Sequence, residues 1–263
     1  MKLFFLGTGA SEGIPAINCQ CPHCCKAIAS GGRFVRQRAA ILCTNEGYTL
    51  LIEVPPDIKH SINSRCHGID LNGVFVSHTH YAHVGGLPEF RYWGRRPGHA
   101  RGKLDLIAPE TIQEVLGEEE MTRLQCEIFM SLRWQPTQPL LLNDLQLVPL
   151  PVDHGGEPTY GALLLSGGKK AVYTSDTSNR LSDRVLALMR DADVLVVNCP
   201  TFQPPKDDHI TVVEAVELKR EVNAARLILT HISHYNKPHD DLVAYARRFP
   251  GVVVAYDGLE VEV

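Results

Sequence analysis

The segment Gly73–Leu87, GVFVSHTHYAHVGGL, constrains this chain more than any other part of the sequence. It begins as an apolar strand and ends in a loop that carries His78, His80 and His83 in front of two glycines. Alternate side chains of an extended backbone point to the same side, so His78 and His80 can reach one point. Surface-loop histidines are the alternative interpretation. So close a group at the end of a strand favours a metal site.

Three further side chains of the metal-binding type each follow another apolar run. LVPLPVDH ends in His154, KAVYTSD ends in Asp176 and RLILTH ends in His231. Loops at the ends of rigid strands are where protein scaffolds commonly present catalytic groups. Zinc binds imidazole nitrogen and carboxylate oxygen, and catalytic zinc sites keep one position open for water. The sequence therefore predicts a site that can hold up to two metal ions.

The pattern of apolar runs predicts an α/β fold. Runs of four to seven residues separated by turn residues indicate strands, and longer amphipathic stretches indicate helices. The predicted strands are Leu3–Leu6, Ala40–Cys43, Thr49–Ile52, Val74–Val76, Leu104–Ile107, Leu145–Leu150, Tyr160–Leu165, Ala171–Tyr173, Val194–Val197, Leu227–Leu229 and Val252–Ala255. The predicted helices are Pro109–Leu116, Leu181–Met189, Thr211–Val222 and His239–Arg248, with Asp208 and His209 as the cap of the third. Two sheets packed together with helices outside would satisfy this order.

Length and charge limit the remaining possibilities. The 263 residues contain no repeat or linker, so we expect one domain over residues 1–263, with an irregular insertion or lid near 91–135. The net charge of −4 argues against binding nucleic acid through bulk charge. No apolar run approaches the ~20 residues of a membrane span. The short apolar start, MKLFFLGTG, indicates a strand and no secretion signal, so we expect a cytoplasmic protein without membrane contact.

The motif SHTHYAH resembles the His-x-His-x-Asp-His signature of the metallo-β-lactamase fold, and His154, Asp176 and His231 resemble its later ligand positions. The runs FLGTGASEGIPAINCQCPHC and LTHISH are similar to those of the phosphoribosyl cyclic phosphodiesterases of phosphonate-degradation (carbon–phosphorus lyase) operons, relatives of the tRNA 3′-processing nucleases. The resemblance covers essentially the whole chain. It implies an αββα sandwich with Zn²⁺ or Mn²⁺ at one edge, and a homodimer. It also implies that His78, His80 and His154 hold a first metal and that His83 and His231 hold a second, with Asp176 bridging.

The chain departs from this family pattern at Ala82, where the signature has Asp. A methyl group offers no lone pair, so the second metal loses one carboxylate ligand and one negative charge. The change is either natural, with a weakened or differently filled second site, or it was introduced to trap a complex. The second interpretation is favoured because every other ligand position is intact. A second departure is Glu53, in a supporting position where the family commonly has Asp.

Cys19, Cys21 and Cys24 lie within the sequence CQCPHCC, a cysteine knuckle near residues 19–25. Three thiolates need a fourth ligand for a tetrahedral structural zinc, and His234 is the candidate. The resemblance implies such a zinc at the matching positions. A redox Cys-x-x-Cys pair and unliganded thiols are the alternatives, but no thioredoxin-like helix start follows the cysteines.

His209, in KDDHITV, is predicted to lie at the start of a helix, where it can bind a phosphate oxygen or protonate a leaving alkoxide. A surface residue next to a helix cap is the alternative. Together these residues favour a metal-dependent phosphodiesterase of a small or cyclic phosphate diester, in which Asp176 orients the nucleophile and His209 assists departure. The alternatives are a hydrolase of another ester or thioester, and a non-hydrolytic metal-binding accessory protein.

Overall fold

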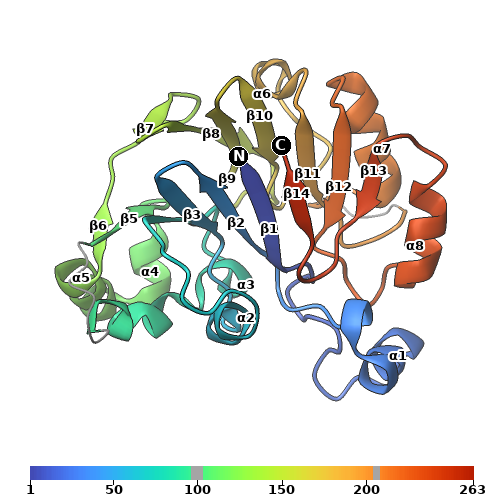
Figure 1. Cartoon of the computed structure of the whole chain (residues 1–263), viewed down its shortest axis with the longest axis horizontal. Coiled ribbons are helices and arrows are strands. Elements are labelled where there is room, and N and C mark those ends of the chain that lie inside the picture. Colours follow the sequence, from blue (N-terminus) through green and yellow to red (C-terminus); the bar gives the residue numbers. More distant parts are fainter. Residues whose placement is uncertain (96–102, 204–207) are drawn as a thin grey trace.

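The computed structural model describes residues 1–95, 103–203 and 208–263, which form two packed seven-stranded sheets with helices outside (Figure 1). The first sheet has the order β14 (Glu260–Glu262), β1 (Lys2–Gly7), β2 (Ala40–Asn45), β3 (Tyr48–Ile52), β4 (Gly73–Phe75), β5 (Leu104–Ile107) and β6 (Phe129–Ser131). The second sheet has the order β13 (Val252–Val254), β12 (Arg226–Thr230), β11 (Val194–Asn198), β10 (Lys169–Tyr173), β9 (Thr159–Ser166), β8 (Leu145–Val152) and β7 (Leu140–Leu142). The predicted αββα sandwich and its main strands are confirmed.

Helices cover the outer face of each sheet. The described helices are α1 (Pro22–Ser30), η1 (Gly32–Phe34), α2 (Ile58–Arg65), α3 (Tyr81–Val84), η2 (Leu87–Arg95), α4 (Ile112–Leu116), α5 (Glu118–Glu127), α6 (Asp183–Met189), α7 (Val212–Glu221) and α8 (His239–Ala246). α2 to α5 bury apolar residues against the first sheet, and α6 to α8 bury theirs against the second. A third apolar cluster, which includes Phe5, Phe75 and Leu164, fills the space between the sheets. No helix among the described residues has the length and apolar character to cross a membrane.

The strand directions determine where a site can form. β3 to β6 run parallel to one another, and so do β10 to β13. The carboxyl ends of each parallel set therefore meet at one edge, and open sheets of this kind bind ligands beyond those ends. Gly86 follows the histidine loop there, and a Cβ on it would lie 2.2 Å from the carbonyl oxygen of Pro55. Only glycine allows the chain to pass this close to the loop after β3.

Two of the sequence predictions are wrong. Described residues 103–135 form β5, α4, α5 and β6 and are no irregular insertion, because their leucines and Met121 pack into the core between charged residues. Residues 91–95 of the predicted insertion end η2, and residues 96–102 lie outside the described chain. The cap of α7 is Thr211, which forms a capping box with Glu214. His209 therefore lies three residues before the first helical residue and not at the helix start.

Candidate metal centre

Three histidine side chains converge beyond the carboxyl end of β4. His78 and His80 lie in the loop between β4 and α3, and His154 comes two residues after β8. Nε2 of His78 is 3.0 Å from Nδ1 of His80, and Nε2 of His154 is 3.2 Å from the same Nδ1. One proton can bridge only one of these nitrogen pairs, so a cation at their centre is what satisfies all three lone pairs. The structure thus brings together the three ligands predicted for a first metal.

Asp176 joins this group to two further histidines. Its Oδ2 lies 3.3 Å from Nε2 of His83 and 3.9 Å from Nε2 of both His78 and His154. Its other oxygen, Oδ1, lies 3.4 Å from Nε2 of His231. The rings of His83 and His231 are stacked with centroids 5.4 Å apart. Asp176 is therefore placed between the two predicted ligand groups, as a bridging carboxylate requires.

The charge states suit a metal centre. Burial and neighbouring imidazoles lower the pKa of His78 well below its usual value, and burial lowers that of His231 to about 3 although Asp176 raises it. Neutral imidazole is the form that binds metal. His83 differs: burial lowers its pKa, but Asp176 and Glu53 together raise it to about 10, so a bound metal ion would have to replace a proton on this ring. Burial would raise the pKa of Asp176, but His231 and His83 hold it well below its usual range.

Buried ring nitrogens without a hydrogen-bond partner show whether a metal ion fits the centre. His83 and His231 are buried, and their ring nitrogens have no hydrogen-bond partner of good geometry within the described residues. Buried polar atoms normally have a partner, and a cation supplies one. Glu53, Ser175 and His231 all adopt positive φ, between 57° and 66°, where non-glycine residues are uncommon. Such strained residues cluster at functional sites. The residues present therefore fit a metal centre.

Ala82 lies in α3 and is 7% exposed. No other carboxylate replaces the missing one among the described groups that could bind a metal here, because Asp176 is the only acid grouped with His78, His83 or His231. Glu53 contacts Nδ1 of His83 at 3.3 Å, whereas Asp176 contacts Nε2 of the same ring. Glu53 therefore supports His83 from behind and does not occupy the place of the lost ligand.

A buried ring of hydrogen bonds and charged contacts around the centre was not predicted from the sequence. Asn198 donates to Oδ1 of Asp176 at 2.8 Å and to the hydroxyl of Tyr173 at 3.1 Å. Tyr173 in turn donates to Glu53 at 3.0 Å, and Glu53 contacts His83. The ring closes where His83 meets Asp176. It orients both groups, and outer partners of this kind usually fix the direction of metal ligands.

His209 lies at the side of the centre and is half-buried. Its ring centroid is 4.8 Å from that of His154 and 5.8 Å from that of His231, with which it is stacked. One of its nitrogens lies within 4.8 Å of ligand atoms of Asp176 and His231. The structure therefore brings His209 next to the predicted metal ligands, although not through a helix start.

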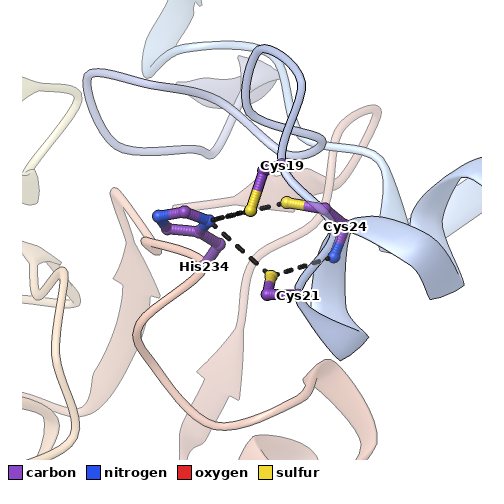
Figure 2. Close-up of side chains that lie close together, drawn as sticks. All are labelled: Cys19, Cys21, Cys24 and His234. Atoms are coloured by element: carbon purple, nitrogen blue, oxygen red, sulfur yellow. Dashed lines mark hydrogen bonds between the residues drawn. The ribbon is translucent and has the colours of Figure 1, made fainter.

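The predicted knuckle residues form a second cluster, shown in Figure 2. Nδ1 of His234 lies 3.2 Å from Sγ of Cys19, 3.7 Å from Sγ of Cys21 and 3.5 Å from Sγ of Cys24. Zinc bonds of ~2.3 Å to sulfur and ~2.0 Å to nitrogen, arranged tetrahedrally, place these atoms about 3.6 Å apart. The four side chains thus fit one zinc ion.

Backbone hydrogen bonds in the knuckle favour thiolate, the form of cysteine that binds zinc. Backbone N–H groups donate to Sγ of Cys21, from Cys24 at 3.4 Å, and to Sγ of Cys24, from Ala16 at 3.3 Å. Burial raises the pKa of Cys21, but the hydrogen bond from the backbone of Cys24, the neighbouring thiols and His234 lower it to about 7. Burial raises the pKa of Cys24 to about 12. A bound metal would deprotonate both thiols, since it binds the thiolate form.

Known proteins resemble the chain over its full length. A solved diphosphatase of the PhnP family matches 100% of this chain and 97% of its own, with a TM-score of 0.83 and 26% identity. Zn²⁺-bound PqqB from Methylobacterium extorquens matches 100% of both chains, with a TM-score of 0.82 and 21% identity, which shows the fold alone. The octanoyltransferase of Porphyromonas gingivalis is 25% identical over 276 residues, which is 99% of this chain but 51% of that protein. The chain thus spans about half the length of this relative.

The diphosphatase and the octanoyltransferase are named for different reactions. A family model described as the beta-lactamase superfamily domain matches residues 52–232. This range contains every predicted ligand of the metal centre, including His231 directly after β12. The chain therefore belongs to the β-lactamase superfamily and has its αββα metallo-β-lactamase fold, the fold of metal-dependent hydrolases.

Proposed function

We propose that this protein is a metal-dependent phosphodiesterase that hydrolyses a small or cyclic phosphate diester. The observation that carries the proposal is the place of Asp176, whose two oxygens contact His83 and His231 while Oδ2 also faces the group of His78 and His154. Such an arrangement suits two neighbouring cations, Zn²⁺ or Mn²⁺. When bound, they lower the pKa of water and neutralise the charge on the phosphate oxygens.

Two residues of the chain would take part directly: Asp176 would orient the attacking water, and His209 would donate a proton. Asp176 is ionised and is held by Asn198, so its oxygens can accept a hydrogen bond from the attacking water and fix its direction. His209 lies beside His154 and His231, where a protonated imidazole would donate to the leaving oxygen. The diphosphatase relative also acts, by its name, on a phosphorus centre, and this supports a phosphate ester as the substrate.

The structure of the centre also predicts a weakness. Its predicted ligands are five histidines and the carboxylate of Asp176, and the only further carboxylate grouped with one of them among the described residues is Asp208, beside His154 and His209, so two dications would be neutralised only in part. With Ala82 in place of an acid, the ion next to His83 and His231 should bind more weakly than the ion next to His78. We therefore propose that activity depends on added metal. We further propose a small-molecule substrate, a cytoplasmic protein, and a homodimer as the quaternary state.

The experiment measures metal content and hydrolysis on one sample. The protein is loaded with Zn²⁺ or Mn²⁺, counted by elemental analysis, and assayed with bis(4-nitrophenyl) phosphate, a 2′,3′-cyclic nucleotide, an inorganic diphosphate and an acyl thioester. We expect diester hydrolysis that rises with added metal, and Asp176→Asn should abolish it. Arg226→Lys, a change at the far end of β12, serves as the control.

Other outcomes separate the alternatives. Faster hydrolysis of the thioester than of either diester would replace the proposal with a thioesterase. A fully loaded protein that hydrolyses none of the four substrates would leave a metal-binding accessory protein.

A further inference from the structure

A cavity of about 1100 Å³ lies beyond the carboxyl ends of β5 and β6. Its lining comes from the residues after these two strands, from α4 and α5, from the segment 132–139 that leads to β7, and from the start of β9. Small-molecule pockets usually measure ~300–1,000 Å³, so this one is larger than a phosphate diester group needs. The metal ligands themselves are not among its lining residues.

The cavity adjoins the metal centre through two contacts. Tyr160, a lining residue of β9, donates its backbone N–H to the carbonyl oxygen of Ser77 at 3.0 Å, next to His78 in sequence. Pro158 also lines the cavity. Its neighbour Glu157 accepts a hydrogen bond from Thr79 in the histidine loop. β4, β5 and β6 are neighbouring strands, which lie ~4.8 Å apart. The cavity therefore begins one strand away from the histidines.

The lining favours a flat, polar ring. Trp134 and Tyr160 meet edge to face, with ring centroids 4.8 Å apart at 82°. Nε1 of Trp134 donates to the carbonyl oxygen of Ala108 at 3.1 Å, which fixes the indole. Aromatic walls bind aromatic ligands by stacking and edge contacts.

The polar part of the lining is mostly neutral. It contains the side-chain amides of Gln113, Gln135 and Gln138, which offer both donors and acceptors. Arg133 and Glu110 are the one cation and the one acid among the described lining residues. An alkyl chain would offer these exposed amides no hydrogen bond, and a second highly charged group would meet a single cation. A heteroaromatic ring with its own donors and acceptors matches both parts of the lining.

We propose that this cavity binds a flat heteroaromatic group of the substrate, of the nucleobase type, while the phosphate lies at the metal centre. This inference rests on the proposed function for the position of the phosphate. It adds a specificity-determining pair, Trp134 and Tyr160, to the ligands of the centre. A substrate with the ring would bind more tightly than the same phosphate ester without it.

The test compares ligands that differ only in the ring. Metal-loaded protein is titrated by calorimetry with adenosine 5′-monophosphate and with ribose 5-phosphate, and tryptophan fluorescence is followed in parallel. We expect adenosine 5′-monophosphate to bind at least about tenfold more tightly and to quench Trp134. Trp134→Leu should remove most of that difference and leave ribose 5-phosphate binding unchanged. Trp93→Phe is the matched control, since Trp93 packs on Phe90 and does not line the cavity.

A second variant covers the case in which Trp134→Leu disturbs the fold. Gln135 is exposed in the segment 132–139, so Gln135→Trp would fill the cavity without entering the core. It should weaken adenosine 5′-monophosphate about tenfold and leave the melting temperature unchanged.

The outcomes for the cavity and for the proposed function are distinct. Equal affinity for the two ligands in the wild type, or no effect of either variant, overturns the cavity proposal even where diesters are hydrolysed. Ring-dependent binding that both variants weaken, in a protein that hydrolyses no diester, supports the cavity and overturns the phosphodiesterase.

Discussion

The knuckle and the metal centre each take one ligand from the short segment after β12, yet they are built in opposite ways. His231 contributes to the centre and His234, three residues later, contributes to the knuckle. The knuckle has four ligands for one ion, and three of them are thiols close together in sequence. The centre collects five histidines and one carboxylate from the ends of four strands, and it lacks the acid that Ala82 replaces. A closed, complete set of ligands is typical of structural zinc, and an incomplete one of catalytic zinc.

The difference predicts different responses to mutation. A structural ion contributes to folding free energy, so its loss changes stability. The ligands of a catalytic site stabilise a reaction, so their loss changes turnover. Backbone N–H groups of Ala10 and Ile232 tie the knuckle side of the chain to the strand end that carries His231, at 3.1 and 2.9 Å. Mutations show whether these contacts couple the two clusters.

The largest effect is expected for Cys21→Ser. The variant should lose one zinc per chain and several kcal/mol of unfolding free energy, because a structural zinc stabilises the fold directly. Elemental analysis and urea unfolding measure both. Cys25→Ser is the matched control, since Cys25 is exposed and lies outside the cluster. A Cys21→Ser protein with full metal content and an unchanged melting temperature would show that the knuckle binds no zinc.

His209→Ala should lower turnover about 10²-fold or more and leave the metal content unchanged, because general acids contribute ~10²–10⁴-fold. The loss should be greatest for substrates with poor leaving groups, which need the proton most. A series of aryl phosphate diesters measures this dependence. Equal losses across the series would count against a proton donor and in favour of a role in binding.

Ala82→Asp should tighten the second metal and raise diester hydrolysis. Changes at outer partners of metal ligands already cost ~10–100-fold, so a restored direct ligand should give at least about a tenfold gain. The sign follows from charge, because the ion beside His83 and His231 gains a second carboxylate. Ala82→Asn, with similar shape and no charge, is the control. The hypothesis would be falsified if metal stoichiometry and turnover stayed as they are in the wild type.

The smallest effect concerns the buried network beneath both clusters. Asp257 accepts hydrogen bonds from Thr8 at 2.7 Å and from the backbone of Gln37 at 2.7 Å, and the carbonyl oxygen of Thr8 accepts from Ile232 beside His231. Burial raises the pKa of Asp257 to about 6, although these hydrogen bonds lower it. The folded protein thus binds this proton more tightly than the unfolded chain does.

The stabilisation from that proton is present below pH ~4 and is lost as the pH rises through about 6. The unfolding free energy of the wild type, relative to that of Asp257→Asn, should fall by about 2 kcal/mol between pH 4.5 and pH 7.5. The comparison cancels the pH dependence of metal binding. Asp241→Asn, on the exposed side of α8, should show a pH-independent difference. A pH-independent difference for Asp257→Asn as well would contradict the raised pKa.

Much of the fold could be predicted because it follows local rules. Apolar runs between turn residues located the long strands, such as β8 and β9, in which Leu147–Leu150 and Gly161–Leu164 are continuously buried. Several of the elements that were not predicted lack this signal. α1 contains cysteines and a histidine in place of an apolar stripe, α5 begins with three glutamates, and β14 has one apolar residue between two acids. Packing against the rest of the molecule holds them in place.

The candidate site was predictable where its residues end strands, and the structure brings those residues together. The supporting residues were not predictable, because their meaning depends on distant neighbours. Tyr173 is 120 residues from Glu53, and both ends of their hydrogen bond are buried. Asn198 ends an apolar strand much as Asp176 follows one, but an amide by itself suggests no ligand. Only the folded sheets show that it orients Asp176.

The spacing of the knuckle ligands also bears on how the chain is assembled. The three cysteines leave the ribosome before His234, which is 210 residues beyond Cys24. Three thiolates can capture zinc from an unfolded chain, and metal bound to the unfolded state reduces the net stabilisation of the folded one. Closing so long a loop costs little more entropy than closing one half as long. We therefore expect the three cysteines to bind zinc while the chain is still being synthesised, and His234 to become the fourth ligand only after the last strands of the second sheet have formed.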